Sequence, residues 1–177
     1  MASNLINFIV PGLGNSGPEH WQTWFEQSGG SFQRINQREW DAPDREDWVS
    51  NIQQAVAGHD PATVILIGHS LGCTAIAHWA NAYKVPVRGA LLVAPSDIET
   101  PQYDFPATGF APIPLSPLPF PSIVVASTND PWVTINRAKL FADAWGSRFV
   151  NIGEAGHINV ASGYTTWSDG LELLRSL

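Results

Sequence analysis

Short apolar runs of strand length alternate along the chain with longer segments of helical period. This alternation is typical of a parallel sheet that is covered by helices on both faces. Several runs consist almost entirely of β-branched residues and leucine, as buried parallel strands tend to. The pattern predicts a three-layer α/β/α sandwich with about six parallel strands. The predicted strands are Leu5–Val10, Phe32–Asn36, Thr63–Ile67, Val87–Val93, Ser122–Ser127 and Phe149–Ile152.

The segments between these runs predict five helices, at Glu19–Gln27, Asp44–Ala57, Leu71–Ala82, Thr134–Trp145 and Trp167–Leu177. In the second of them, Trp48, Ile52 and Val56 recur at helical spacing and mark one buried face. Asp44 is expected to cap the start of this helix, and Gly58 is expected to end it.

The stretch from Ala94 to Pro121 interrupts the alternation. It carries eight prolines and has no sustained helical or strand period. An irregular segment of this length inside a domain is usually functional or disordered, and this one follows the fourth predicted strand. We interpret it as a lid-like excursion over the carboxyl edge of the sheet.

Composition narrows the class of protein. A chain of 177 residues with 44% hydrophobic and 14% charged residues fits one folded domain that spans residues 1–177. The net charge of −7 leaves no basic stripe, so nucleic acid and anionic membranes are poor partners and a small-molecule substrate is favoured. With one cysteine, no pattern of a secretory leader and no long apolar run, we expect a cytoplasmic protein.

The motif with the most specific chemistry is Gly68-His69-Ser70-Leu71-Gly72. It follows a predicted strand and precedes a predicted helix, which is the context of a nucleophile elbow. In this turn the hydroxyl of Ser70 is presented at a helix N-terminus, and the amide of Leu71 can stabilise a developing oxyanion. A pentapeptide of this form also arises by chance, so the prediction of a nucleophile depends on whether the sequence offers Ser70 a base and an acid.

A nucleophilic serine needs a base and an orienting acid, and in this fold they follow the serine in the order acid, histidine. Asp130 follows the fifth predicted strand and His157 follows the sixth. Asp97, after the fourth strand, is the alternative acid. Asp130 is favoured because Asn129 and Pro131 place it in a turn at the end of a strand.

The remaining histidines fit the role of the base less well. His59 precedes the third strand, His69 lies inside the elbow and His78 lies on the following helix, so structural roles are expected for all three. His20 could reach the site from the first loop, as a supporting residue of the pocket. Trp132, directly after the acid, is a second candidate for the substrate pocket.

The first loop, Gly12-Leu13-Gly14-Asn15-Ser16-Gly17, also fits the glycine pattern of a dinucleotide site. In that fold the helix starts within the glycine motif, whereas Pro18 here indicates a helix that starts after it. A hydrolase would use the same loop differently, since the amide of Leu13, with or without that of Gly14, could complete an oxyanion hole with Leu71. We expect no cofactor, and neither the histidines nor the lone cysteine has the spacing of a metal site.

Four stretches together resemble one known family. They are Pro11-Gly12-Leu13-Gly14-Asn15-Ser16-Gly17-Pro18-Glu19-His20-Trp21, Trp40-Asp41-Ala42-Pro43 with Trp48, Gly68 to Cys73, and Gly156-His157-Ile158-Asn159 with Ser162-Gly163. The chain is similar over nearly its whole length to the small serine hydrolases related to retinoblastoma-binding protein 9 and its bacterial counterparts. The resemblance implies a minimal α/β-hydrolase fold and a triad of Ser70, Asp130 and His157, with hydrolysis of an ester, thioester or amide. A hydrolase-like binding domain with an unused triad is the alternative.

Overall fold

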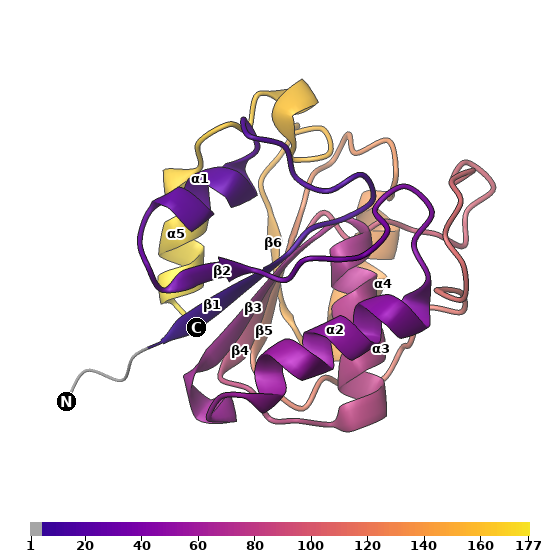
Figure 1. Ribbon diagram of the computed structural model, residues 1–177. Helices are drawn as coiled ribbons and strands as arrows, with labels where there is room; N and C mark the ends of the chain where they lie inside the picture. Colours follow the sequence, from indigo (N-terminus) through magenta and orange to yellow (C-terminus); the bar gives the residue numbers. More distant parts are fainter. Residues whose placement is uncertain (1–4) are drawn as a thin grey trace.

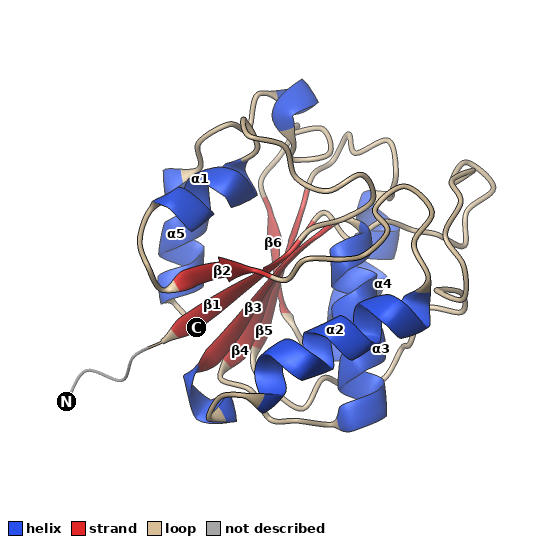
Figure 2. Cartoon of the chain, in the orientation of Figure 1, coloured by secondary structure: helices blue, strands red, loops and turns tan. Residues whose placement is uncertain are grey.

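The computed structural model describes residues 5–177, and its centre is a single sheet of six strands (Figures 1 and 2). All five neighbouring pairs run parallel, in the order β2-β1-β3-β4-β5-β6. The four central strands are buried along almost their whole length, which agrees with their apolar sequences. The strands are β1 Ile6–Val10, β2 Phe32–Arg34, β3 Val64–His69, β4 Gly89–Val93, β5 Ser122–Ala126 and β6 Arg148–Asn151.

Helices cover both faces of the sheet, so the predicted three-layer fold is confirmed. Figure 1 shows α1 and α5 on one face and α2, α3 and α4 on the other. Each face has its own buried apolar cluster, with Trp48 and Trp79 on the side of α2 and α3 and Trp21 and Phe25 on the side of α1. The helices are α1 Trp21–Gln27, α2 Arg45–Ala57, α3 Leu71–Tyr83, α4 Ile135–Trp145 and α5 Ser168–Arg175.

The ends of several elements agree with the sequence prediction and others differ. The carboxylate of Asp44 accepts the Glu46 and Asp47 amides at the start of α2, and Gly58 follows its end, as predicted. Helix α1 begins two residues later than predicted because the side chain of His20 caps it. Strand β2 ends at Arg34, two residues earlier than predicted, although the Ile35 amide still donates to the Ile9 carbonyl of β1.

The segment 94–121 contains no helix and makes one isolated bridge, between Thr108 and Asp44. Its second half is anchored in the core by the buried side chains of Phe110, Ile113 and Phe120. The interpretation of the whole stretch as a lid is therefore wrong for this half, because removing three large apolar side chains from the core would be costly. Only the first half lies beside the candidate site.

The order of the strands fixes where a site can form. The chain goes from β1 outward to β2 and then back across β1 to β3, so the connections that follow β1 and β3 leave the sheet in opposite directions. Ligands of open α/β sheets bind at this switch point, outside the carboxyl ends of the strands. The loop with Leu13 follows β1, and Ser70 follows β3, so both predicted features lie at this position.

Candidate active site

Ser70 occupies a strained turn between β3 and α3. Its φ of 56° and ψ of −124° lie in a region that residues with a side chain rarely adopt. The turn is packed tightly against β1, since a Cβ at Gly72 would lie 2.2 Å from the carbonyl oxygen of Val10. Glycine at this position allows the approach, and the Ser70 amide is held by the Val93 carbonyl at 3.0 Å. The predicted nucleophile elbow is thus present in its backbone geometry.

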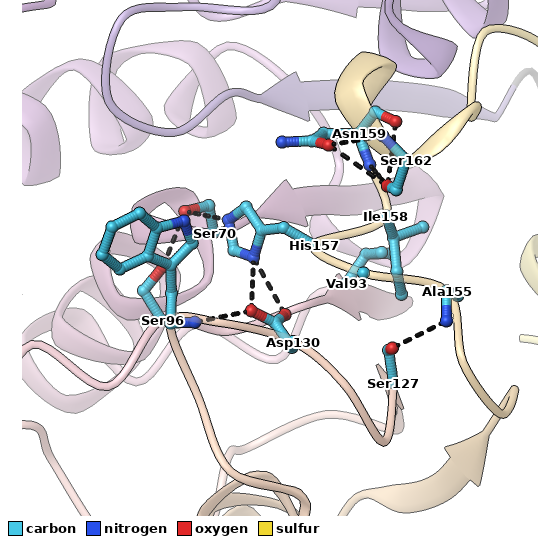
Figure 3. Close-up of polar contacts among 12 residues, drawn as sticks. Ser70, Val93, Ser96, Ser127, Asp130, Ala155, His157, Ile158, Asn159 and Ser162 are labelled. Carbon is cyan, nitrogen blue, oxygen red and sulfur yellow. Dashed lines mark hydrogen bonds and ion pairs between the residues drawn. The ribbon is translucent and has the colours of Figure 1, made fainter. Parts of the chain in front are cut away.

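The structure brings Ser70, His157 and Asp130 together from the ends of three strands (Figure 3). The Ser70 Oγ lies 2.9 Å from His157 Nε2, and His157 Nδ1 lies 3.0 and 2.9 Å from the two carboxylate oxygens of Asp130. The Asp130 side chain is 0% exposed and that of His157 is 9% exposed. A buried carboxylate at Nδ1 fixes the proton on that nitrogen, which leaves Nε2 free to accept the proton of Ser70.

The loop that carries His157 is held from several sides. His69 Nε2 donates to the His157 carbonyl oxygen at 2.9 Å, and the Trp21 indole donates to the Ile158 carbonyl at 2.8 Å. Gly156 has a φ of +55°, and a Cβ there would lie 2.7 Å from the Cβ of Ser162. These contacts fix the imidazole through its own backbone, so His69 has the structural role that the sequence indicated, and Trp21 has a structural role as well.

The loop after β5 is tied to the same histidine loop. Asp130 Oδ1 accepts the Trp132 amide at 2.8 Å, which orients the carboxylate. Asn129 Oδ1 accepts the Gly156 amide at 2.7 Å, and Ser127 Oγ accepts the Ala155 amide at 2.9 Å. The acid and the histidine are therefore positioned by one shared hydrogen-bond network.

Ser96 is a site residue that the sequence reasoning did not find. Its hydroxyl is buried, and Ser96 Oγ lies 2.7 Å from Ser70 Oγ. The residue comes from the irregular segment after β4, two residues after Ala94, which has a φ of 49°. No periodicity in the sequence marks this position, because an irregular loop brings it to the site.

Asp97, the alternative acid, is engaged elsewhere. Its carboxylate binds Arg137 of α4 through two hydrogen bonds, of 2.9 and 3.0 Å. Its amide donates to the Trp132 carbonyl, so this residue fastens the loop after β4 to the loop after β5. The structure thus brings Asp130, and not Asp97, to His157.

Two of the remaining histidines also have structural contacts. His78 Nε2 bonds the Phe110 carbonyl at 2.7 Å and so helps to anchor the segment 94–121. His59 packs its ring against Phe8. Burial lowers the pKa of His78, which keeps the imidazole neutral in this contact.

The candidate oxyanion donors are the Leu13 amide, directly after Gly12 in the chain, and the Leu71 amide, which lies close to Gly12. A Cβ at Gly12 would lie 2.8 Å from Ser70 Cβ and 3.2 Å from the Leu71 amide nitrogen, so glycine keeps open the space beside both. Leu13 lines the same cavity. The Gly14 amide, however, donates to the Trp40 carbonyl at 2.8 Å, and the expectation that it could join the hole is wrong.

The first loop does not present a helix N-terminus to a pyrophosphate. Helix α1 begins at Trp21, four residues after Gly17, and the Gln22 amide donates to the imidazole of His20. The helix amides that would bind the phosphates in a dinucleotide fold therefore come after the glycine motif, and the Gln22 amide already has His20 as its partner. This arrangement argues against the dinucleotide reading of the glycine pattern.

A cavity of about 230 Å³ opens above Ser70. Tyr103, Phe105 and Trp132 form one aromatic side of it, with the rings of Phe105 and Trp132 4.9 Å apart and those of Tyr103 and Phe105 5.0 Å apart. The Tyr103 hydroxyl is buried without a hydrogen-bond partner among residues 5–177, and burial raises its pKa to about 12. The other lining residues are Leu13, Asn15, His20, His69, Ser96, His157 and Asn159.

Two buried histidines of the site, His20 and His69, have lowered pKa values. Burial, Arg34 and His157 lower the pKa of His20 to about 4. Burial, together with His157 and His20, holds the pKa of His69 well below its usual value. The rings of His20 and His69 lie 4.8 Å apart, and those of His69 and His157 4.9 Å apart. Positive charge on one ring would repel positive charge on the next, which adds to the effect of burial on His20 and His69.

Other chemistries find little support in the part of the chain that the structure describes. Residues 5–177 contain no cluster of three histidine, cysteine or acidic side chains that could hold a metal ion. Cys73 is buried against the Val93 carbonyl, and burial raises the pKa of its thiol, which opposes thiolate chemistry. Within the same residues, none of the helices has the length and apolar character needed to span a bilayer.

Comparisons with known proteins agree with this geometry. A family model described as serine hydrolase matches residues 7–176. A YdeN-like hydrolase from Pectobacterium atrosepticum is 39% identical, with 97% of this chain and 89% of that chain covered and a TM-score of 0.86. The ydeN gene product of B. subtilis is 20% identical, with 97% of both chains covered and a TM-score of 0.84.

More distant solved structures share the fold. RedJ, a thioesterase from the prodiginine biosynthetic pathway in Streptomyces coelicolor, is 12% identical, with 99% of this chain and 89% of that chain covered and a TM-score of 0.69. At this identity the likeness shows the fold alone. No curated protein matches the chain.

Proposed function

The chain belongs to the serine hydrolase family, and from this premise we propose that Ser70, His157 and Asp130 are its catalytic triad. The observation that carries the proposal is the continuous path of short contacts from Ser70 Oγ through the imidazole to the buried Asp130 carboxylate. The strained backbone of Ser70 supports it, because strain of this kind accumulates at functional positions.

Acylation begins when His157 Nε2 takes the proton of Ser70 as Oγ attacks the substrate carbonyl. A bond forms between Oγ and the acyl carbon, and the carbonyl oxygen becomes an oxyanion. The amides of Leu13 and Leu71 hold this charge in the space that Gly12 leaves open. The bond to the leaving group then breaks, and the imidazolium returns its proton to that group.

Deacylation repeats these steps with water. His157 removes a proton from the water, the resulting hydroxide attacks the acyl carbon, and Ser70 leaves with the proton from the imidazolium. Asp130 stays ionised throughout and stabilises the charged imidazole.

The bond that is cleaved is an ester, thioester or amide of a small molecule. A cavity of about 230 Å³ beside Ser70 suits a small acyl or alcohol group, and Trp132 and His20 form part of its wall. The cytoplasmic location, and the absence of nucleic acid and membrane partners, stay predictions from the sequence.

A fluorophosphonate probe tests the proposal, because it reacts only with an activated serine. The folded protein should be labelled at Ser70, and labelling should vanish in Ser70→Ala and after denaturation. A folded wild-type protein that resists the probe would instead indicate a binding domain with an unused triad. Circular dichroism of both proteins provides the control for folding.

A further inference from the structure

One polar side of the cavity is formed by Asn15, His20 and Asn159, which come from the loop after β1 and the loop after His157. Each of these side chains has one acceptor and at least one donor. In each of the three side chains, a backbone N–H of the protein already donates to the acceptor atom. Only the donor groups of these side chains are left to bind a ligand.

Asn15 shows this most clearly. Its Oδ1 accepts the Ser16 amide at 2.8 Å and the Arg34 guanidinium at 2.8 Å. Both partners can only donate, so they identify the oxygen of the amide and fill its two lone pairs. The Asn15 side chain therefore has only its NH₂ group to offer to the cavity.

His20 follows the same rule. Its Nδ1 accepts the Gln22 amide at 3.1 Å, which requires an unprotonated Nδ1. The proton of the neutral ring is then on Nε2, which becomes a fixed donor. Burial and the positive charge of Arg34, which lower the pKa of His20 to about 4, agree with a neutral ring.

Asn159 completes the set. Its Oδ1 accepts the Ser162 amide at 3.2 Å and the Ser162 hydroxyl, also at 3.2 Å. Figure 3 shows the amide nitrogen of Asn159 pointing away from these contacts. Like Asn15, it has an NH₂ group as its remaining polar function.

We propose that the substrate carries a neutral carbonyl oxygen near the bond that is cleaved, and that Asn15 Nδ2, His20 Nε2 and Asn159 Nδ2 bind it. A neutral acceptor fits better than an anion, because the lining has no lysine or arginine and the chain carries a net charge of −7. The aromatic side of Tyr103, Phe105 and Trp132 binds the apolar part of the same molecule. This inference rests on the proposed hydrolase function and adds a substrate class to it.

Two matched pairs of esters test the inference. In the acyl pair, 4-nitrophenyl 4-oxopentanoate differs from 4-nitrophenyl pentanoate by one ketone oxygen. In the alcohol pair, 4-oxopentyl butyrate differs from pentyl butyrate in the same way. In at least one pair, the ester with the ketone should have a kcat/KM about tenfold higher or more.

Asn15→Asp and Asn159→Asp then identify the donors, because aspartate keeps the acceptor oxygen and replaces only the NH₂ group. In at least one of these variants the preference should fall by about five- to tenfold, since a hydrogen bond is lost. Asn81→Asp, on the exposed side of α3, adds the same charge and should keep the preference. The quantity compared is the ratio of the two kcat/KM values within a pair, so an effect of the substitution on His157 as the general base cancels.

Equal hydrolysis of both members in both pairs, dependent on Ser70, would overturn the inference and leave the proposed function standing. A preference that persists in both aspartate variants would also overturn it. If Ser70 is not labelled by the fluorophosphonate and no ester is hydrolysed, the proposed function itself fails, and the inference falls with it.

Discussion

The hydroxyl of Ser96 donates a hydrogen bond to Ser70 Oγ, and the direction follows from the protons of the triad. The two oxygens lie 2.7 Å apart. The His157 Nδ1 proton is directed to Asp130, so Nε2 accepts the proton of Ser70. Ser70 has one proton, which leaves Ser96 as the donor. In the proposed mechanism, Ser96 therefore orients Ser70 before the substrate arrives and stabilises the negative charge that develops on Oγ.

Ser96→Ala should therefore slow acylation by about three- to tenfold, the effect of one lost hydrogen bond. The rate of deacylation should change less, because in the acyl-enzyme Ser70 Oγ is an ester oxygen with no proton to orient. Burst kinetics with a 4-nitrophenyl ester separate the two steps.

Ser122→Ala is the matched control for Ser96→Ala. It removes the 2.6 Å hydrogen bond between the hydroxyls of Ser122 and Ser147. Ser122 lies at the amino end of β5, whereas the candidate site lies at the carboxyl end. Both variants should lose a similar amount of unfolding free energy, whereas only Ser96→Ala should lose acylation rate. Equal acylation rates in wild type and Ser96→Ala would contradict the assigned role.

The identity of the acid can be decided by two amide variants. Asp130→Asn should lower kcat by about 10⁴-fold, because the amide favours the wrong tautomer of His157. Asp97→Asn should leave kcat close to the wild-type value, since its carboxylate contacts Arg137 and not the imidazole. Steady-state kinetics on a reactive ester check both. A large loss in Asp97→Asn alone would reassign the acid.

The sequence predicts the triad because its members follow strands. In a parallel sheet all carboxyl ends meet at one edge. The positions of the strands alone therefore predict that Ser70, Asp130 and His157 lie close together. Ser96 could not be predicted in this way, because an irregular loop without periodicity brings it to the site. For the same reason the burial of Phe110 was not predicted, since a proline-rich stretch gives no pattern that separates a core anchor from an exposed tip.

Acid should destabilise the fold through the buried histidines. The unfolded chain binds a proton at His20 near pH 6.5, whereas the folded chain does so only near a pKa of about 4, because of burial, Arg34 and His157. Between these values the unfolded state holds more protons, so the free energy of unfolding falls as the pH falls. The expected slope is about 1.4 kcal/mol per pH unit for this group.

Urea denaturation at several pH values between 4 and 7 measures this slope. His20→Asn should reduce it by about the contribution of one histidine, since asparagine can still cap α1 and does not titrate. His69, whose pKa is also lowered by burial, should account for a further part of the slope. An identical slope in His20→Asn and wild type would show that His20 is not protonated on unfolding in this range.

Gly12→Ala should abolish most activity, because the added Cβ would either displace Ser70 or fill the space beside it. The added Cβ would lie 2.8 Å from Ser70 Cβ and 3.2 Å from the Leu71 amide nitrogen, in the space assigned to the oxyanion. Loss of one oxyanion donor costs about 10²- to 10³-fold in kcat, and we expect a loss of at least this size. Gly17→Ala lies in the same loop, has no atom within 4 Å of the added Cβ and should retain activity. If the two variants have equal kcat values, the oxyanion does not bind beside Gly12.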